Sequence, residues 1–324
     1  MNDSPGAPAP RPAALPMPDL QESFPGTFAT SPHAEAIEEQ TTHWLKEFPL
    51  VNSPRALKTL CNITAQGVAR LLPTADRDGA FLCADLFLWL TAFDDAHGET
   101  EGARDTARMV RRISQCVHLL AGHDEPTDDD SAFTAALRDL LRRFRERATP
   151  TQYLRLTAHL RDNLFGILWE AHHLDRLDQV TLDDYRAMRP HTVFVRTVMV
   201  TAEVVLRYEL TEDQRASAAV RELEKAVADL AGWINDLASY AKETARGGPL
   251  PLSLPTLLMQ HRERDLEGAF HTASRMCEDQ ASTARLRITE LTIKDKGPLS
   301  DHARALESVA ASYVWHIGHS RYRN

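Results

Sequence analysis

Two groups of oxygen-bearing side chains stand out, because the spacing of each group favours one face of a helix. The stretch FLWLTAFDDAHGET, residues 87–100, ends an apolar run in Asp94, Asp95 and Glu99. Residues four apart lie on nearly the same face of an α-helix, since each residue advances about 100°. Asp95 and Glu99 would therefore lie close together at the helix end, and Asp94 would lie about 100° away around the helix axis. Taken alone, the three carboxylates could equally mark a helix end that reaches water.

The second group lies in WINDLASYAKE, residues 233–243, where Asn235, Ser239 and Glu243 follow one another at intervals of four. An amide oxygen, a hydroxyl and a carboxylate would form one stripe about 12 Å long. Oxygen ligands of this kind suit Mg²⁺, which commonly shares its coordination with substrate phosphates. The alternative is an ordinary solvated helix face. Apolar residues interleave with the stripe, which favours a helix buried on most sides, where polar groups need ligands or partners: Trp233, Ile234 and Leu237.

Helical patterns continue along almost the whole chain, and extended alternation of apolar and polar residues is scarce. Ser-Pro pairs at Ser31–Pro32 and Ser53–Pro54 predict two early helix starts. Further helices are expected at about 78–97, 102–120, 129–147, 150–176, 182–208, 212–245, 264–294 and 300–319. The sequence therefore predicts an all-α fold with one domain over residues 31–324. Residues 1–30 are rich in Pro and Ala and are predicted to form a disordered tail.

Composition limits the partners of the chain. The 324 residues carry a formal net charge of −9, which argues against a broad nucleic-acid-binding or anionic-membrane surface. No apolar run approaches the roughly 20 residues of a membrane span, and the N-terminus lacks a signal-peptide core. The four cysteines lie far apart and indicate neither a zinc site nor a disulfide framework. We therefore expect a cytoplasmic protein with no nucleic-acid partner and no membrane insertion.

The two oxygen-rich groups match a known family. DDAHGE resembles the DDxxxE form of the aspartate-rich motif, and NDLASYAKE resembles the NDxxSxxxE motif, of class I terpene synthases, the bacterial single-domain terpene cyclases. Their order and their separation of 141 residues also match, and the resemblance extends from about Phe24 to the C-terminus. It implies a helical bundle around a central apolar cavity, with Mg²⁺, three ions in number, as cofactor. The implied metal ligands are Asp94, Asp95, Glu99, Asn235, Ser239 and Glu243, of which Asp95 and Glu99 either bind metal directly or act through hydrogen bonds.

Further positions match the residues with which the family contacts diphosphate. Arg189 precedes Asn235 by 46 residues, as the diphosphate-sensing arginine does, and Lys242 matches a basic residue beside the metal motif. Arg321 and Tyr322 match the C-terminal Arg-Tyr pair. The resemblance also implies a helix break at about Thr192 and Val193. Pro190 departs from the pattern, because proline disfavours a regular helix at the residue before it, here Arg189.

These assignments predict an enzyme that ionises a linear prenyl diphosphate and releases diphosphate, giving a cyclic terpene hydrocarbon or alcohol. Farnesyl diphosphate is the expected substrate, since it is the commonest among bacterial relatives, and geranyl or geranylgeranyl diphosphate is the alternative. The residues expected to act in catalysis are Asp94, Arg189, Asn235, Ser239 and Glu243. A chain-elongating prenyltransferase is less favoured, because it needs a second aspartate-rich motif. A noncatalytic isoprenoid-binding protein would have no reason to keep two sets of oxygen ligands. The protein could be a monomer or a homodimer.

A carbocation intermediate requires an apolar wall that excludes water, and aromatic faces can stabilise its charge. Each aromatic residue in a helical pattern could instead belong to ordinary core packing. The candidates for the wall are Phe87, Trp89, Phe93, Phe165, Phe194, Trp233 and Trp315.

Overall fold

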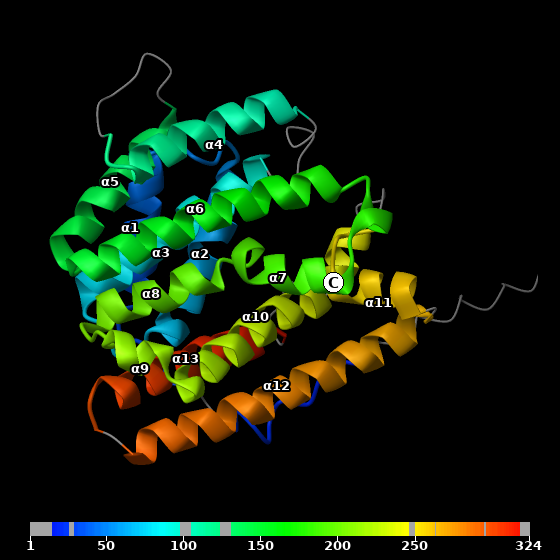
Figure 1. The fold of residues 1–324 in the computed structure, drawn as a ribbon. Helices are drawn as coiled ribbons and strands as arrows, with labels where there is room; N and C mark the ends of the chain where they lie inside the picture. Colours follow the sequence, from blue (N-terminus) through cyan, green and yellow to red (C-terminus); the bar gives the residue numbers. More distant parts are fainter. Residues whose placement is uncertain are drawn as a thin grey trace, which may run out of the picture.

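The computed structural model describes residues 15–25, 29–97, 105–123, 131–245, 250–262, 264–294 and 296–317, and these residues form helices and connections without any strand (Figure 1). The prediction of an all-α fold is therefore confirmed. The helices are α1 (Ala34–Glu47), α2 (Pro54–Leu71), α3 (Arg77–His97), α4 (Thr106–Leu120), α5 (Ala132–Arg147), α6 (Pro150–His173), the 3₁₀ turn Leu177–Gln179, α7 (Leu182–Thr192), α8 (Val195–Leu206), α9 (Glu212–Ala216), α10 (Ala218–Thr244), α11 (Leu254–Arg262), α12 (Leu266–Lys294) and α13 (Pro298–Ile317).

The two predicted helix starts have different outcomes. Ser53 caps α2, because its hydroxyl accepts a hydrogen bond from the Ala56 backbone N–H at 3.3 Å, and Pro54 is the first helical residue. At the earlier Ser-Pro pair, the Ser31 hydroxyl accepts from the His33 N–H in the turn before the helix. α1 then begins only at Ala34. The prediction of a helix start at Pro32 was therefore two residues too early.

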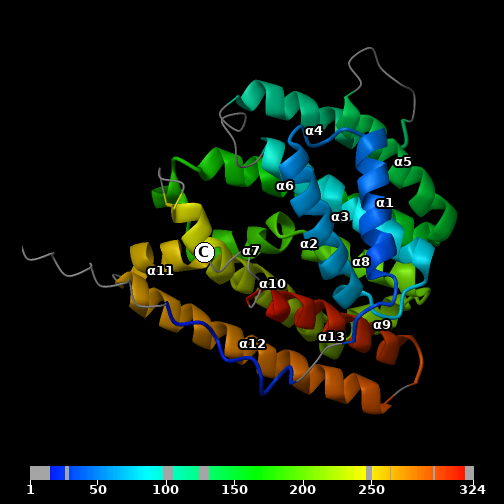
Figure 2. The ribbon, with the colours of Figure 1, turned by 180° about the vertical axis from the view of Figure 1, so that it is seen from behind.

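The helix α3 lies at the centre of the bundle and contributes to two apolar cores. One side of the helix, including Cys83 and Ala84, packs into a core shared with α2, α8, α10, α12 and α13. The other residues, including Leu82, Trp89 and Phe93, pack into a core shared with α1, α4, α5 and α6. In Figures 1 and 2, α4 and α5 lie on one side of the molecule and α12 on the opposite side, with α3 between them. The end of α3 that carries the two aspartates is thus positioned by packing along its whole length.

The N-terminal segment 15–25 corrects the predicted extent of the disordered tail. Leu20 and Phe24 are buried, and the Arg285 guanidinium of α12 lies over the Phe24 ring, 5.5 Å from its centroid. Arg285 also donates to the Ser23 carbonyl oxygen at 2.7 Å. Figure 2 shows the segment running along α12. Two large apolar side chains within a Pro-rich stretch are enough to hold it against the bundle. Residues 1–14 lie outside the described residues.

A buried ion-pair network joins helices at the end of α8. The Glu203 carboxylate is fully buried and accepts hydrogen bonds from Arg155 at 2.9 and 3.0 Å and from Arg215 at 3.0 and 3.1 Å. Because both oxygens of Glu203 have cationic donors, its burial is compensated. Within the described part of the chain, no helix is long and apolar enough to cross a membrane.

A second buried carboxylate, Asp85 of α3, makes stability depend on pH. Its side chain is 0% exposed, and one oxygen accepts from Arg143 at 2.8 Å. Burial raises the pKa of Asp85 to about 7, although the charge of Arg143 acts in the opposite direction. The folded protein therefore holds this proton up to a higher pH than the unfolded chain does, whose aspartates ionise near about 4.

The free energy of unfolding should consequently contain a component that falls by about 2–3 kcal/mol between about pH 5 and about pH 8. Asp85→Asn cannot ionise and should remove this component, so the wild-type minus variant difference should decline over the same range. Urea denaturation followed by circular dichroism at several pH values measures it. Parallel pH profiles for the two proteins would contradict the assignment.

Candidate active site

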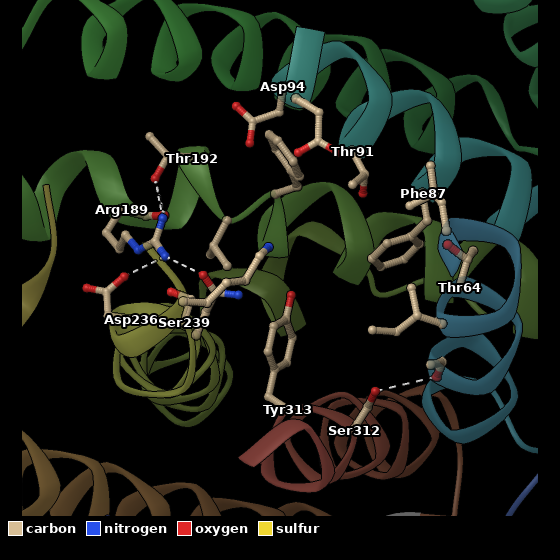
Figure 3. A pocket seen from close by; sticks show the side chains of 18 of the residues that line it. Thr64, Phe87, Thr91, Asp94, Arg189, Thr192, Asp236, Ser239, Ser312 and Tyr313 are labelled. Carbon is tan, nitrogen blue, oxygen red and sulfur yellow. Dashed lines mark hydrogen bonds and ion pairs between the residues drawn. The ribbon is translucent and has the colours of Figure 1, made fainter. Parts of the chain in front are cut away.

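The aspartates of α3 and the oxygen stripe of α10 line one end of the same cavity, as predicted (Figure 3). Asp94 and Asp95 lie in the last turn of α3, and Asn235, Ser239 and Glu243 lie along α10. The two helices bring together residues that are more than a hundred positions apart in the chain. The other walls of the cavity come from α2, α6, α7, the connection between α7 and α8, the segment just before α11, and α13.

The stripe on α10 is polar because it faces the cavity, while the rest of the helix is buried among apolar neighbours. Trp233, Ile234 and Leu237 belong to the core, with exposed fractions of 4% or less. Ser239 is also buried, and Asn235 and Glu243 are half-buried. A polar face inside an otherwise buried helix is costly unless it meets a ligand or a partner. The placement therefore supports the prediction that this face binds something polar.

Arg189 of α7 is held at the cavity by three oxygen atoms. Its Nη2 lies 2.6 Å from an Asp236 carboxylate oxygen and 2.8 Å from the Asn235 amide oxygen, and its Nη1 donates to the Thr192 hydroxyl at 2.9 Å. Gly232 makes room for the arginine, since a Cβ there would lie 2.7 Å from Arg189 Cγ. Burial lowers the pKa of Arg189, but the neighbouring negative charges, Asp236 first, more than offset this and raise it. Arg189 is a fixed cation beside the metal motif.

Asp236 is the centre of this arrangement. It is 2% exposed and accepts hydrogen bonds from Arg189, from the Tyr185 hydroxyl and from the Leu254 N–H at the start of α11. Burial raises the pKa of Asp236, although the charge of Arg189 opposes the shift. Asp236 thus joins α7, α10 and α11 through one buried carboxylate. Its apolar sequence neighbours were the available signal that it is inside.

The predicted helix break lies where α7 ends at Thr192 and α8 begins at Val195. Phe194 between them has a left-handed backbone with φ 61°, which is uncommon for a bulky residue and stores strain. Thr192, Val193 and Phe194 all line the cavity, so the break itself forms part of the cavity wall. Pro190 does not end the helix at Arg189: α7 continues two residues beyond it to Thr192, although proline has no N–H to donate to the carbonyl of the preceding turn.

Of the remaining predicted polar residues, the structure describes only Lys242. Lys242 lines the cavity and is half-buried, next to Glu243 on α10, and its contact with diphosphate stays a prediction. Glu99, Arg321 and Tyr322 lie outside the described residues, so their roles stay predictions. Sequence reasoning missed several polar residues that line the cavity from other helices: Thr64, Thr91, Glu170, Ser312 and Tyr313.

Most of the predicted aromatic wall is wrong. Phe87 and Phe194 line the cavity, but the others lie elsewhere. Helical periodicity identifies an inward face without telling a cavity from a packed core, and both are apolar. Trp89, Phe93 and Trp233 are buried in the cores, Phe165 is 57% exposed at the surface, and the Trp315 ring lies under the Arg70 guanidinium, 4.2 Å from its carbon.

The residues at the polar end of the cavity fit divalent metal ions. Carboxylate, amide and hydroxyl oxygens from two helices converge there, and these are the ligands that Mg²⁺ prefers. Away from the cavity, Glu203, Glu224 and His302 bring three potential ligand atoms within 4.8 Å of one another. This group does not fit a metal equally well, because two arginines already bind both oxygens of Glu203.

Comparison with known proteins agrees with this geometry. The profile of terpene synthase family 2, C-terminal metal binding, matches residues 85–282, and the chain belongs to the terpene synthases. It is 70% identical over 312 residues to the (12E)-labda-8(17),12,14-triene synthase of Streptomyces anulatus, covering 96% of this chain and 97% of the relative. It is 54% identical to an enzyme of the same name from Streptomyces cyslabdanicus, covering 95% and 94%. The linalool/nerolidol synthase of Streptomyces clavuligerus shares the fold, with a TM-score of 0.76 at 21% identity over 90% of this chain and 98% of its own.

The chain is accordingly a lyase that acts on a prenyl diphosphate with the help of a divalent metal, as predicted from the two motifs. The names of the two similar relatives favour the diterpene alternative over the expected farnesyl substrate.

The buried pair of Asp236 and Arg189 yields a prediction about both folding and turnover. Asp236→Asn keeps the shape of the side chain but leaves the Arg189 charge buried without its carboxylate, at a cost of about 3–5 kcal/mol. We expect a lower melting temperature and a turnover reduced by about tenfold or more, because Arg189 loses its fixed position.

Tyr185→Phe is the matched control for that variant. It removes one hydrogen bond to the same carboxylate and should cost only about 1 kcal/mol, with a smaller effect on turnover. Thermal unfolding and diphosphate release, measured on both variants, test the ranking. Wild-type stability and turnover in Asp236→Asn would show that the carboxylate does not hold Arg189 in place.

Proposed function

We propose that this protein converts a bicyclic C20 diphosphate, labda-8(17),13-dien-15-yl diphosphate, into a labdatriene and inorganic diphosphate. The observation that carries the proposal is the 70% identity, over nearly the full length of both chains, to a synthase named for a labda-8(17),12,14-triene. The cavity supports it, since a polar, cation-bearing end adjoins an apolar interior.

The double bonds in that product name define the chemistry that the site must perform. Breaking the C15–O bond sends its electron pair out with diphosphate and leaves an allylic cation over C13, C14 and C15. Loss of a proton from C12 then supplies the electrons for a C12–C13 double bond, and C14–C15 becomes the terminal double bond. The reaction balances without an oxidant or reductant and needs no new ring.

The two fused rings of a labdane require a different start, namely protonation of an alkene at the far end of a linear chain. The lining carboxyl groups that Figure 3 labels, Asp94 and Asp236, lie on the side of the cavity where metal and diphosphate would bind, away from Thr64 and Ser312. Asp236, the most buried of them, is paired with Arg189. This distribution supports ionisation of a substrate whose rings are already closed.

The chain's own residues divide the work as follows. Asp94 on α3 and Asn235, Ser239 and Glu243 on α10 would hold Mg²⁺, three ions by resemblance to the family. Bound there, the metal would neutralise charge on the departing diphosphate. Arg189 and Lys242 would bind diphosphate oxygens, and Arg189 can do so through two N–H groups at once. The apolar walls would keep water from the cation, so that the product is a hydrocarbon.

Product analysis tests the proposal directly. Purified protein with Mg²⁺ should convert the labdadienyl diphosphate into a labdatriene, detected by gas chromatography with mass spectrometry. Farnesyl and geranylgeranyl diphosphates, offered separately, should react more slowly because neither presents the closed rings. A cyclic product from a linear substrate alone would favour a cyclase of linear prenyl diphosphates, and longer prenyl diphosphates formed with isopentenyl diphosphate would favour a prenyltransferase.

The metal-binding assignment has its own test in Asn235→Leu and Glu243→Gln. Each should lower diphosphate release by about 10²-fold or more, because a ligand for the charge-neutralising ion is lost. The helical circular-dichroism spectrum should be retained. Glu222→Gln is the matched control, since Glu222 lies on α10 but is 49% exposed and pairs with Arg287 at the surface. Wild-type rates in both site variants would contradict the assignment.

A further inference from the structure

Gly67 is an unusual residue on the wall of the cavity, because its helix gives no structural reason for a glycine. It lies within α2, where glycine is unfavourable relative to alanine. Three other helical glycines are explained by close contacts. A Cβ at Gly79, Gly166 or Gly232 would lie between 2.7 and 3.1 Å from a neighbouring side chain. A Cβ at Gly67 would meet nothing within 4 Å.

The open space in front of Gly67 belongs to the cavity. One face of α2 lines the cavity along its length, with side chains recurring at helical spacing: Leu60, Ile63, Thr64, Gly67, Val68 and Leu71. Every member of this face except Gly67 projects a side chain beyond Cα. The glycine therefore leaves a recess in a wall that is otherwise filled.

A second small residue borders the recess from another helix. Ser312 of α13 lines the cavity, is 2% exposed, and donates its hydroxyl to the Gly67 carbonyl oxygen at 3.4 Å. Figure 3 shows Thr64 and Ser312 on the side of the cavity opposite Arg189 and Asp236. The recess thus lies away from the residues expected to hold diphosphate, where the far end of a substrate would sit.

We propose that the recess at Gly67 is the specificity determinant that admits the fused rings of a bicyclic C20 substrate. This inference rests on the proposed function, because it assigns the recess to the ring system of the labdadienyl diphosphate. Two fused six-membered rings are wider than a linear isoprenoid chain. A side chain at position 67 would occupy the width that the rings need, without disturbing the diphosphate end.

The variants Gly67→Ala and Gly67→Leu test the inference, with Gln66→Leu as the matched control. Gln66 is the adjacent residue of α2 and does not line the cavity. Gln66→Leu therefore places the same leucine side chain on α2 outside the cavity. Gly67→Leu should lower kcat/KM for the labdadienyl diphosphate by roughly tenfold or more, and Gly67→Ala by less. Melting temperatures should not fall below wild type, since alanine and leucine favour helix more than glycine does.

Calorimetric binding of inorganic diphosphate in the presence of Mg²⁺ separates a filled recess from a disturbed site. The dissociation constant of inorganic diphosphate should stay within about twofold of the wild-type value in both Gly67 variants. A loss of diphosphate binding as large as the loss of turnover would overturn the inference, as would wild-type kcat/KM in Gly67→Leu. If the wild-type protein itself fails to turn over the labdadienyl diphosphate, the proposed function fails, and the assignment of the recess fails with it. That outcome is distinguishable because it appears in the wild-type protein, without any substitution.

Discussion

The ion pair between Asp236 and Arg189 is the interaction on which the site depends. Asp236 is buried and the Arg189 side chain is only 11% exposed, so separating the two charges would be strongly destabilising. Through this pair the end of α7 is joined to α10, and the hydrogen bond from the Leu254 N–H adds the start of α11. A structural carboxylate therefore fixes the cation that faces the diphosphate end of the cavity.

The distribution of polar and apolar residues in the cavity reflects two opposing requirements. A single pocket must stabilise a departing anion and also protect a cation from water. The chain separates the two requirements in space. Charged and polar side chains of α3, α7 and α10 line one end of the cavity, while α2 and the connection between α7 and α8 supply most of the apolar wall. The strained backbone at Phe194 lies in the connection between α7 and α8, which lines the cavity.

The sequence was sufficient to predict the fold class and the convergence of the metal motifs, because both follow from helical spacing. The intervals of four between Asn235, Ser239 and Glu243 are enough to assign these residues to one face. Asp236 was missed, since spacing alone places it on another side of α10 and cannot reveal the arginine that covers it. Trp89 and Phe93 were assigned to the wall because an apolar residue facing a cavity has the same periodicity as one facing a core.

Substrate size was the feature that the motifs could not predict. Farnesyl diphosphate was expected because it is common among bacterial relatives. The length of substrate that a cavity accepts depends instead on the shape of the wall opposite its diphosphate-binding end. That shape is set by residues such as Gly67 and Ser312, which come from α2 and α13 and carry no motif. The size of a cavity depends on how separate helices pack, and this information is not contained in any one stretch of sequence.

The central claim is that the oxygen groups of α3 and α10 bind metal around one diphosphate contacted by Arg189. Crystals grown with inorganic diphosphate and with Mn²⁺ replacing Mg²⁺ would test it most directly, since anomalous diffraction locates Mn²⁺. The expected result is metal bound by Asp94 and by the stripe of Asn235, Ser239 and Glu243, with Arg189 bonded to the same diphosphate. Metal bound instead at Glu203, Glu224 and His302, or a diphosphate out of reach of Arg189, would contradict the account.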